Sequence, residues 1–212
     1  LIDACLEQRY VGLEVFSGIP GTVGGSVFIN VHYFEHLLSD FLVTARVVDR
    51  ATGTFLNVDV DWFKFGYNQS TLQRKQHYLV SATLKLTRSD ALAAAYACGR
   101  RDEIIRHRSR RYPAERTCGR FFRNFTDQEI CNARSSKVTV PFVAYYLDRI
   151  GVKGALQVGQ ARVSHHHANM LVTAPGATSG DVIALARLMQ QKVVDAFGIF
   201  PHPECQIIGF DH

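Results

Sequence analysis

The sequence predicts an α+β fold, with helices and strands that do not alternate as regularly as in a parallel α/β sheet. Three observations carry this prediction: a hairpin pattern over residues 41–60, an alternating pattern over 77–88, and an amphipathic helix pattern over 178–197. The chain has 212 residues, 47% hydrophobic and 20% charged. This composition is typical of an ordinary soluble protein that buries a core. No apolar run approaches the roughly 18 residues that a membrane span needs.

The N-terminal part is expected to contain a helix end and a glycine-rich loop. Residues 1–10 would form the helix end, which Gly12 stops. Residues 18–25 read Gly-Ile-Pro-Gly-Thr-Val-Gly-Gly, and their four glycines and one proline predict a loop. Glycine lets a backbone come close to a ligand, but turns need glycine too, so this loop alone is weak evidence for a binding site. No Gly-Lys-Ser/Thr follows, which excludes a Walker-type phosphate loop.

Strands are expected next along the chain. Residues 41–50 and 54–60 predict two strands that join in a hairpin at Thr52-Gly53. Over 77–88 apolar and polar residues alternate, which predicts a strand with one buried face. The residues expected on that face are Tyr78, Val80, Ala82, Leu84 and Leu86.

Three helices are expected in the rest of the chain. Ser89 and Asp90 can cap a helix that runs to about Arg108, and a domain boundary is placed near Pro113. Pro141 begins a short helix that ends before Gly151. The last helix starts with a capping box at residues 178–181 and stops at Gly198. Its apolar stripe contains Val182, Leu185, Ala186, Met189, Val193, Ala196 and Phe197.

Cysteine and histidine patterns argue against a metal site. The five cysteines are Cys5, Cys98, Cys118, Cys131 and Cys205, and they contain no Cys-x-x-Cys pair, so reduced thiols are expected. The run 165–167 is three histidines, but no carboxylate or cysteine completes a ligand set at useful spacing. We therefore expect no bound metal.

Positive charge is concentrated in one stretch. The net charge is +5, and nine arginines lie within residues 100–123. Such a cluster suits a polyanion such as a dinucleotide or a nucleotide-sugar diphosphate, and the alternative is a solvated basic helix face. Nucleic acid is not expected as a partner because no known binding motif accompanies the charge.

Five motifs follow one another along the chain. The first is Gly12-Leu13-Glu14 with the glycine-rich loop and Asn30. The others are Phe65-Gly66-Tyr67-x-x-Ser70, Cys118-Gly119-x-Phe121-Phe122-Arg123-Asn124, Gly151-Val152-Lys153-Gly154 followed by Val163-Ser164-x-x-His167-Ala168-Asn169, and Phe197-Gly198-Ile199 followed by Pro203-Glu204-Cys205-Gln206-Ile207-Ile208-Gly209. In this order they resemble the UDP-N-acetylmuramate dehydrogenases (MurB family), and the first is similar to the family's FAD-contacting loop. The resemblance covers nearly the whole chain.

The resemblance implies a domain arrangement. Residues 1–112 would be the second half of a vanillyl-alcohol-oxidase-type FAD-binding domain, whose first half, with the loop that grips the FAD pyrophosphate, precedes it in the family. Residues 113–200 would be the α+β substrate domain, and 201–212 a segment that returns to the active site. We expect this chain alone to bind FAD weakly or not at all.

The resemblance also implies a reaction. NADPH reduces the FAD, and UDP-N-acetylglucosamine enolpyruvate then accepts a hydride to give UDP-N-acetylmuramate, a peptidoglycan precursor. The addition builds negative charge on the substrate carboxyl group, so a cation and a hydrogen-bond donor aimed at that group lower the barrier. The neighbouring carbon needs a positioned proton donor. A cytoplasmic enzyme with no membrane partner is implied, and the oligomeric state stays open.

Site residues follow from the matched motifs. The expected catalytic residues are Glu204, Arg120, Tyr67 and Cys118. The expected cofactor-binding residues are Gly18, Ile19, Pro20, Gly21, Thr22, Gly24, Gly25 and Asn30. The expected substrate-binding residues are Asn68, Ser70, Arg123, Asn124 and His167.

Two positions depart from the family pattern. Asn68 stands where the family has an arginine, and Arg120 stands where it has the proton-donating serine. An arginine is a poor proton donor because the pKa of its guanidinium exceeds about 12. One hypothesis is that Arg120 supplies the missing cation and that Cys118, Tyr67 or a water gives the proton. The alternatives are an impaired UDP-sugar-binding homologue and a related flavoenzyme with another substrate.

Overall fold

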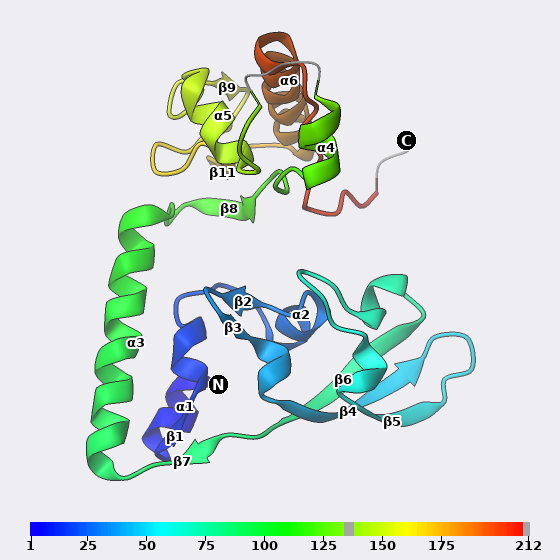
Figure 1. Ribbon diagram of the computed structural model, residues 1–212, viewed down its shortest axis with the longest axis vertical. Coiled ribbons are helices and arrows are strands. Elements are labelled where there is room, and N and C mark those ends of the chain that lie inside the picture. Colours follow the sequence, from blue (N-terminus) through cyan, green and yellow to red (C-terminus); the bar gives the residue numbers. More distant parts are fainter. Residues whose placement is uncertain (134–137, 210–212) are drawn as a thin grey trace. The chain divides into compact units, whose positions relative to one another are not determined.

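The computed structural model describes residues 1–133 and 138–209, which form two compact units, Leu1–His107 and Arg108–His212 (Figure 1). Helices and mainly antiparallel short strands make up both units, which confirms the predicted α+β class. Helix α3 (Ala91–Arg111) contains the boundary between the units. Residues 210–212 of the predicted C-terminal segment lie outside the described residues.

The first unit begins with short elements. Helix α1 (Ile2–Glu7) is followed by a small sheet of β1 (Tyr10–Val11) and β7 (Thr87–Arg88). The other short elements are β2 (His32–Tyr33), β3 (His36–Leu37) and the 3₁₀ helices η1 (Leu13–Phe16), η2 (Leu38–Asp40), η3 (Asp61–Phe63) and η4 (Thr71–Arg74).

The prediction of a loop over all of residues 18–25 is wrong at its end. Helix α2 (Val23–Phe28) starts inside this segment and includes Gly24 and Gly25. The reason is Thr22, whose side chain accepts a hydrogen bond from the Gly25 amide at 3.0 Å and so caps the helix. The cap outweighs the weak helix propensity of two adjacent glycines.

The main sheet of the first unit has the strand order β5-β4-β6. Its strands are β4 (Leu42–Asp49), β5 (Phe55–Asp59) and β6 (His77–Leu84), all antiparallel. The predicted hairpin is confirmed, and Gly53 takes the positive φ of 70° that its turn needs.

Strand β6 corrects the prediction of one continuous buried face. Arg46 pairs with Ser81 whereas the next residue of β4, Val47, pairs with Leu79, so Val80 is an extra residue, a β-bulge. A bulge reverses the alternation, so Ala82 and Leu84 pack on the core whereas Tyr78 and Val80 are 56% and 50% exposed.

Helix α3 starts as predicted and ends three residues later than expected, at Arg111. Asp90 caps it, because its carboxylate accepts a hydrogen bond from the Ala93 amide at 2.8 Å. Several of the clustered arginines are paired with acidic side chains: Arg100 with Glu14, Arg101 with Asp3 and Asp102, and Arg106 with Glu103. These pairs favour the interpretation of this part of the cluster as a solvated basic helix face.

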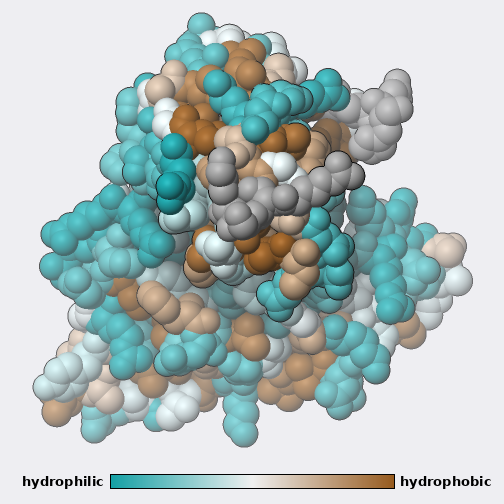
Figure 2. All heavy atoms as spheres, turned by 45° about the horizontal axis from the view of Figure 1, so that its top comes forward, coloured by the Kyte–Doolittle hydropathy of each residue, from teal (hydrophilic) through white to brown (hydrophobic). Residues whose placement is uncertain are grey.

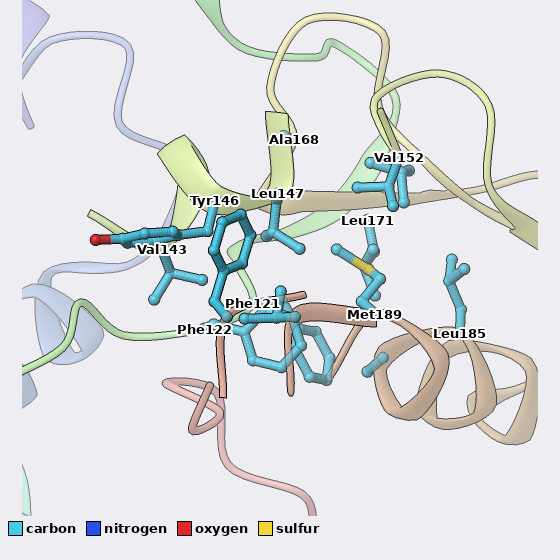
Figure 3. Packing of buried hydrophobic residues seen from close by; sticks show 14 of the residues in the cluster. Phe121, Phe122, Val143, Tyr146, Leu147, Val152, Ala168, Leu171, Leu185 and Met189 are labelled. Atoms are coloured by element: carbon cyan, nitrogen blue, oxygen red, sulfur yellow. The ribbon is translucent and has the colours of Figure 1, made fainter. Parts of the chain in front are cut away.

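The second unit has a four-stranded antiparallel sheet in the order β8-β11-β10-β9. Its elements are β8 (Arg116–Arg120), α4 (Asp127–Asn132), α5 (Val143–Arg149), β9 (Gln157–Val158), β10 (Ala161–Val163), β11 (Met170–Thr173) and α6 (Ser179–Phe197). Helices α5 and α6 and the segment after β8 enclose one core, in which Phe122, Tyr146, Leu147 and Met189 lie together (Figure 3).

Helix α6 confirms the predicted capping box and stop. Thr178 accepts from the Asp181 amide at 3.1 Å, Asp181 accepts from the Thr178 amide at 3.0 Å, and Gly198 is left-handed with φ of 70°. Of the predicted apolar stripe, Ala196 is wrong, because it lies on the exposed face of the helix.

The surface is mixed in character. On the face drawn in Figure 2, hydrophilic side chains cover much of the surface and smaller groups of hydrophobic side chains lie between them. Among residues 1–133 and 138–209, no helix combines the length and the apolar character that crossing a membrane requires.

Candidate functional site

The glycine-rich segment of the first unit borders a cavity of about 320 Å³. Gly18 and Gly21 have positive φ angles of 72° and 148°, conformations that side-chain-bearing residues rarely adopt. No atom lies within 4 Å of the position that a Cβ on Gly21 would take. The loop thus presents bare backbone to open space. The cavity is lined on this side by Ser17, Gly18, Ile19, Gly21, Thr22, Val23 and Ser26.

Ser17 is an unusual member of this lining. Its side chain is only 2% exposed, and its hydroxyl has no hydrogen-bond partner within the described residues. A buried hydroxyl without a partner costs about 1–3 kcal/mol. Such a group at the wall of a cavity marks a place where a ligand atom would complete the hydrogen bond. Ser17 was not among the predicted site residues, although it directly precedes the matched loop.

Two predicted segments of the first unit lie side by side. The Asn30 side chain donates to the Gly66 carbonyl at 3.4 Å, and the Ser70 hydroxyl donates to the Phe28 carbonyl at 2.6 Å. These bonds join the end of α2 to the segment that carries Tyr67. The side-chain oxygen of Asn30 (Oδ1) also accepts from the Ser39 amide at 3.0 Å. Asn30 and Ser70 therefore have structural partners already, and their ligand roles stay predictions.

Tyr67 and Asn68 form the tip of the turn between Gly66 and Gln69. The Tyr67 ring is 62% exposed and lies 4.5 Å from the His32 ring, measured between centroids. Asn68 is left-handed, with φ of 54°. The turn thus presents an accessible phenol, as a site residue requires.

In the second unit a β-bulge shapes the end of β8. Met170 pairs with Arg120 and Val172 with Thr117, so two residues of β8, Cys118 and Gly119, lie opposite Leu171 alone. Gly119 has φ of 85°, which only glycine adopts at little cost. A bulge turns the side chains around it out of the normal alternation, and bulges are common next to active sites.

The C-terminal segment returns to this end of β8. Phe122 and Pro203 form an antiparallel bridge, the Glu204 amide donates to the Phe121 carbonyl at 2.7 Å, and the Arg123 amide donates to the His202 carbonyl at 3.0 Å. Arg120 and Glu204, which were both predicted as catalytic residues, therefore lie on neighbouring backbone segments, and their roles stay predictions.

Asn169 holds the segment that follows Arg120. Its side chain is 1% exposed and bonds Phe122 twice, accepting from its amide at 3.0 Å and donating to its carbonyl at 2.7 Å. Its own carbonyl accepts from the Phe121 amide at 2.9 Å. Asn169 belongs to one of the matched motifs, but no role was predicted for it. Its signal is a polar residue directly before the apolar strand β11.

Two thiols meet beside these residues. The hydrogen bond between Cys118 and Cys205 lowers the pKa of Cys118 to about 7, against a smaller opposing effect of burial. The same bond, followed by burial, raises the pKa of the Cys205 thiol. Cys118 was predicted as a candidate from its motif, whereas Cys205 was not predicted as its partner because the two lie 87 positions apart in the sequence.

Arg123 is engaged by a carboxylate. Its guanidinium contacts both oxygens of Glu129, at 2.8 and 2.7 Å. This pairing, with a further contribution from Thr126, holds the pKa of Glu129 at about 2. Arg123 also donates to the Asn124 carbonyl at 3.0 Å. A substrate role for Arg123 would require the guanidinium to share or leave this pair, so that role stays a prediction, as does the one for Asn124.

His167 is a partly buried, neutral histidine. Its pKa falls to about 4, mainly because of burial and then because of the positive charges of Arg111 and Arg120. The ring stacks on Tyr112, with centroids 5.9 Å apart, and Nδ1 accepts from the Asn169 amide at 3.1 Å. It lies within the electrostatic reach of Arg120, so the structure brings these two predicted residues into one region.

Within the described parts of the chain, no three or more His, Cys, Asp or Glu side chains are grouped so that they could hold a metal ion. His165 and His166 are exposed. All five cysteines are free thiols.

One group of known proteins is similar to this chain, and a family model matches its second half. Residues 111–208 match the family described as UDP-N-acetylenolpyruvoylglucosamine reductase, C-terminal domain. The reductase of that name from Prochlorococcus marinus is 32% identical over 200 residues, 94% of this chain and 62% of the relative. The one from Pediococcus pentosaceus is 32% identical over 208 residues, 98% of this chain and 63% of the relative. The chain therefore spans less than two thirds of the length of these relatives.

A solved structure shows the same likeness. The crystal structure of UDP-N-acetylenolpyruvylglucosamine reductase from Thermus caldophilus superposes with a TM-score of 0.75 at 25% identity, over 96% of this chain and 67% of that one. The fold, the matched domain and the relatives along nearly the full chain agree. Residues 111–208 thus match the C-terminal domain of the UDP-N-acetylenolpyruvoylglucosamine reductases, and nearly the full chain is similar to these enzymes.

Proposed function

We propose that this chain takes part in the FAD-dependent reduction of UDP-N-acetylglucosamine enolpyruvate to UDP-N-acetylmuramate, with NADPH as the reductant, in cytoplasmic peptidoglycan precursor synthesis. The observation that carries the proposal is the 2.7 Å bond from the Glu204 amide to the Phe121 carbonyl. It sets the segment of Glu204 beside that of Arg120, the two residues expected at the substrate carboxylate. The similarity of nearly the full chain to these reductases supports the choice of reaction.

The residues of the first unit fit a flavin. FAD, when bound, would supply a carrier that accepts hydride from the nicotinamide and delivers it to the substrate. Gly18, Gly21 and Thr22 would approach it through their backbone, because the space beside Gly21 is open. The buried Ser17 hydroxyl would find its missing partner there. The remaining expected contacts are Ile19, Pro20, Gly24, Gly25 and Asn30.

Arg120 would pair with the substrate carboxylate, on which negative charge develops during the reaction, and Glu204 is the second group at that carboxylate. A fixed cation there stabilises charge that appears only in the transition state. Cys118, with a pKa of about 7, is suited to give a proton near neutral pH. Tyr67 and a water are the other candidate donors. Asn68, Ser70, Arg123, Asn124 and His167 are proposed to contact the rest of the UDP-sugar.

The proposed roles are divided among three consecutive segments of the chain. Residues 1–112 would serve the flavin, 113–200 the substrate, and 201–212 the return of Glu204 to the site. Nucleic acid is not proposed as a partner.

Arg120→Ala, made in the protein as its gene encodes it, tests the proposal. We expect the oxidation of NADPH that depends on the enolpyruvyl substrate to fall by roughly 100-fold or more, the effect of losing one stabilising group of a transition state. Arg187→Ala is the matched control, because Arg187 is an exposed arginine of α6. Near-normal turnover of Arg120→Ala would refute the role of Arg120.

Two other functions remain distinguishable. A flavin oxidoreductase with another substrate would oxidise NADPH without responding to the enolpyruvyl compound. An impaired UDP-sugar-binding homologue is favoured by Asn68 and Arg120 at the positions of the family's arginine and serine. Calorimetry that shows binding of UDP-N-acetylglucosamine, together with an absence of turnover, would select the last function.

A further inference from the structure

Two of the five free cysteines lie at one place although they are far apart in the sequence. Cys118 belongs to β8, and Cys205 belongs to the C-terminal segment that pairs with the residues after β8. The Cys205 sulfur lies 4.0 Å from the Phe121 carbonyl oxygen. Each of the two thiols is the main group that acts on the pKa of the other. Two thiols on such neighbouring segments need only a small movement to form a covalent bond.

The pairing of the C-terminal segment sets the two cysteines near each other. In a regular antiparallel pair the bridge between Phe122 and Pro203 sets Arg120 opposite Cys205. Cys118, two residues before Arg120, is then a diagonal neighbour of Cys205. The bulge of β8 and the positive φ of Gly119 interrupt the regular alternation beside Cys118.

The two thiols differ in accessibility. Cys118 is exposed, whereas Cys205 is partly buried and packs against the core of the second unit. A reagent from solution therefore meets Cys118 first. This asymmetry is typical of a thiol pair in which one cysteine attacks and the other resolves.

We propose that Cys118 and Cys205 form a reversible disulfide by exchange with small-molecule disulfides of the glutathione class. The Cys118 thiolate attacks one sulfur of the oxidant, whose sulfur–sulfur bond breaks and releases one thiol. Cys205 then loses its proton and attacks the Cys118 sulfur of the mixed disulfide, which releases the second thiol. In total two cysteine thiols are oxidised, one disulfide is reduced to two thiols, and both protons leave with the released thiols.

The electrostatics agree with this order of attack. The pKa of Cys118 is about 7, so about half of it is thiolate at neutral pH. The pKa of Cys205 is raised, so it stays a thiol until Cys118 has reacted. The low-pKa, exposed sulfur is the one expected to attack.

The bond would have a consequence for the site. It would tie β8 to the segment that carries Glu204 and would remove the Cys118 thiol as a proton donor. Reversible inhibition of turnover follows from this, and only that consequence rests on the proposed function. The disulfide itself is measurable without any enzyme assay.

The first test maps the disulfide in the 212-residue chain. The chain is oxidised with oxidised glutathione, its remaining thiols are alkylated, and it is digested with trypsin. Arg116 and Arg120 flank Cys118, so Cys118 and Cys205 lie in separate tryptic peptides. We expect one cross-linked pair of these peptides, lighter than the two reduced peptides by the mass of two hydrogens and split by dithiothreitol. Full alkylation of Cys118 after oxidation, or pairing of Cys118 only with other cysteines, overturns the proposal.

Single variants test the order of attack. Cys205→Ser is expected to stop at a glutathione adduct on Cys118, whereas Cys118→Ser gives no adduct on Cys205. Cys98→Ser is the matched control, because Cys98 is exposed on α3, and it should form the disulfide as the wild type does. If a glutathione adduct accumulates on Cys205 instead, Cys118 is not the attacking thiol, and the proposed order of attack is overturned.

The rate of alkylation checks the hydrogen bond between the thiols. Cys205→Ala removes the bond, which returns the pKa of Cys118 toward the ordinary 9.0. At pH 7 the loss of thiolate outweighs its higher nucleophilicity, so alkylation of Cys118 should slow about five-fold. Thermal melting of each variant shows whether it is folded. An unchanged rate in a folded variant contradicts the assigned role of Cys205.

Discussion

Asn169 clamps Phe122 by both of its backbone polar groups, with bonds of 3.0 Å to the amide and 2.7 Å to the carbonyl. Phe122 is fully buried, so water cannot replace these bonds. Because Phe122 follows Arg120 by two residues and itself bridges Pro203, the clamp fixes the backbone of the candidate site.

Asn169→Ala should therefore destabilise the protein. The change leaves two buried backbone groups without partners, which costs about 2–4 kcal/mol in the free energy of unfolding. Urea titration followed by circular dichroism measures this. Asn169→Asp keeps an acceptor for the Phe122 amide, but it loses the donor to the Phe122 carbonyl and buries a carboxylate, so it should also destabilise the protein at neutral pH. Asn132→Ala, on the exposed side of α4, is the control and should change stability by no more than about 0.5 kcal/mol. Equal losses for Asn169→Ala and Asn132→Ala would contradict the clamp.

Substitution of Gly154 tests why this position of the motif needs glycine. The cause is either the left-handed backbone conformation or the lack of space for a side chain. Gly154 and Gly151 have the same φ of 69°, but a Cβ on Gly154 would collide with the His165 ring, whereas nothing lies within 4 Å of one on Gly151. Gly151→Ala should cost about 1 kcal/mol from the left-handed backbone alone. Gly154→Ala should cost more, and the excess should disappear when His165→Ala is added. An excess that persists in the double variant would place the cause elsewhere.

Much of the fold was predictable from local sequence patterns, because helix caps and tight turns depend on residues that are close together in the sequence. The capping box at Thr178 and the turn at Gly53 involve residues a few positions apart, and both are confirmed. The bulge at Val80 was not predictable, because it depends on how β6 pairs with β4, which no pattern within β6 records.

The candidate site, too, was predictable where a local motif records it and unpredictable where it depends on distant segments. The matched motifs located Arg120, Cys118 and Glu204, and the structure brings their segments together. Motif matching could not supply partners that come from distant segments or from packing. Thus the contact of Cys118 with Cys205 and the buried hydroxyl of Ser17 emerged only from the folded chain.

His167 should give the stability of the protein a pH dependence below neutrality. Its folded pKa of about 4 lies under the ordinary 6.5, so the unfolded chain binds more protons between these values. The neutral ring therefore contributes stability that is fully present above pH 6.5 and is lost as the pH falls toward 4, by about 2 kcal/mol after allowance for partial exposure. Urea titrations from pH 7 to pH 4 should show this slope, and His167→Asn should flatten it.

A direct titration separates the causes of this shift. Nuclear magnetic resonance of the His167 ring should give the pKa of about 4 in the wild type. Arg111→Gln removes one of the positive charges that act on the ring, so the pKa should move up toward its ordinary value without reaching it, since burial remains the main cause. A wild-type value near 6.5 would contradict the buried, neutral ring.

Ser17→Ala should separate stability from flavin binding. Because the Ser17 hydroxyl is buried without a partner in the described structure, its removal should raise the free energy of unfolding by about 1 kcal/mol. The same change should weaken FAD binding, measured by flavin fluorescence in the protein as its gene encodes it, because the proposed hydrogen bond to the cofactor is lost. Ser70→Ala is the matched control: its hydroxyl already donates to the Phe28 carbonyl at 2.6 Å, so its removal should lower stability instead. If Ser17→Ala destabilises the protein and leaves FAD affinity unchanged, the hydroxyl does not belong to a flavin site, and the cavity beside the glycine-rich loop must be assigned another role.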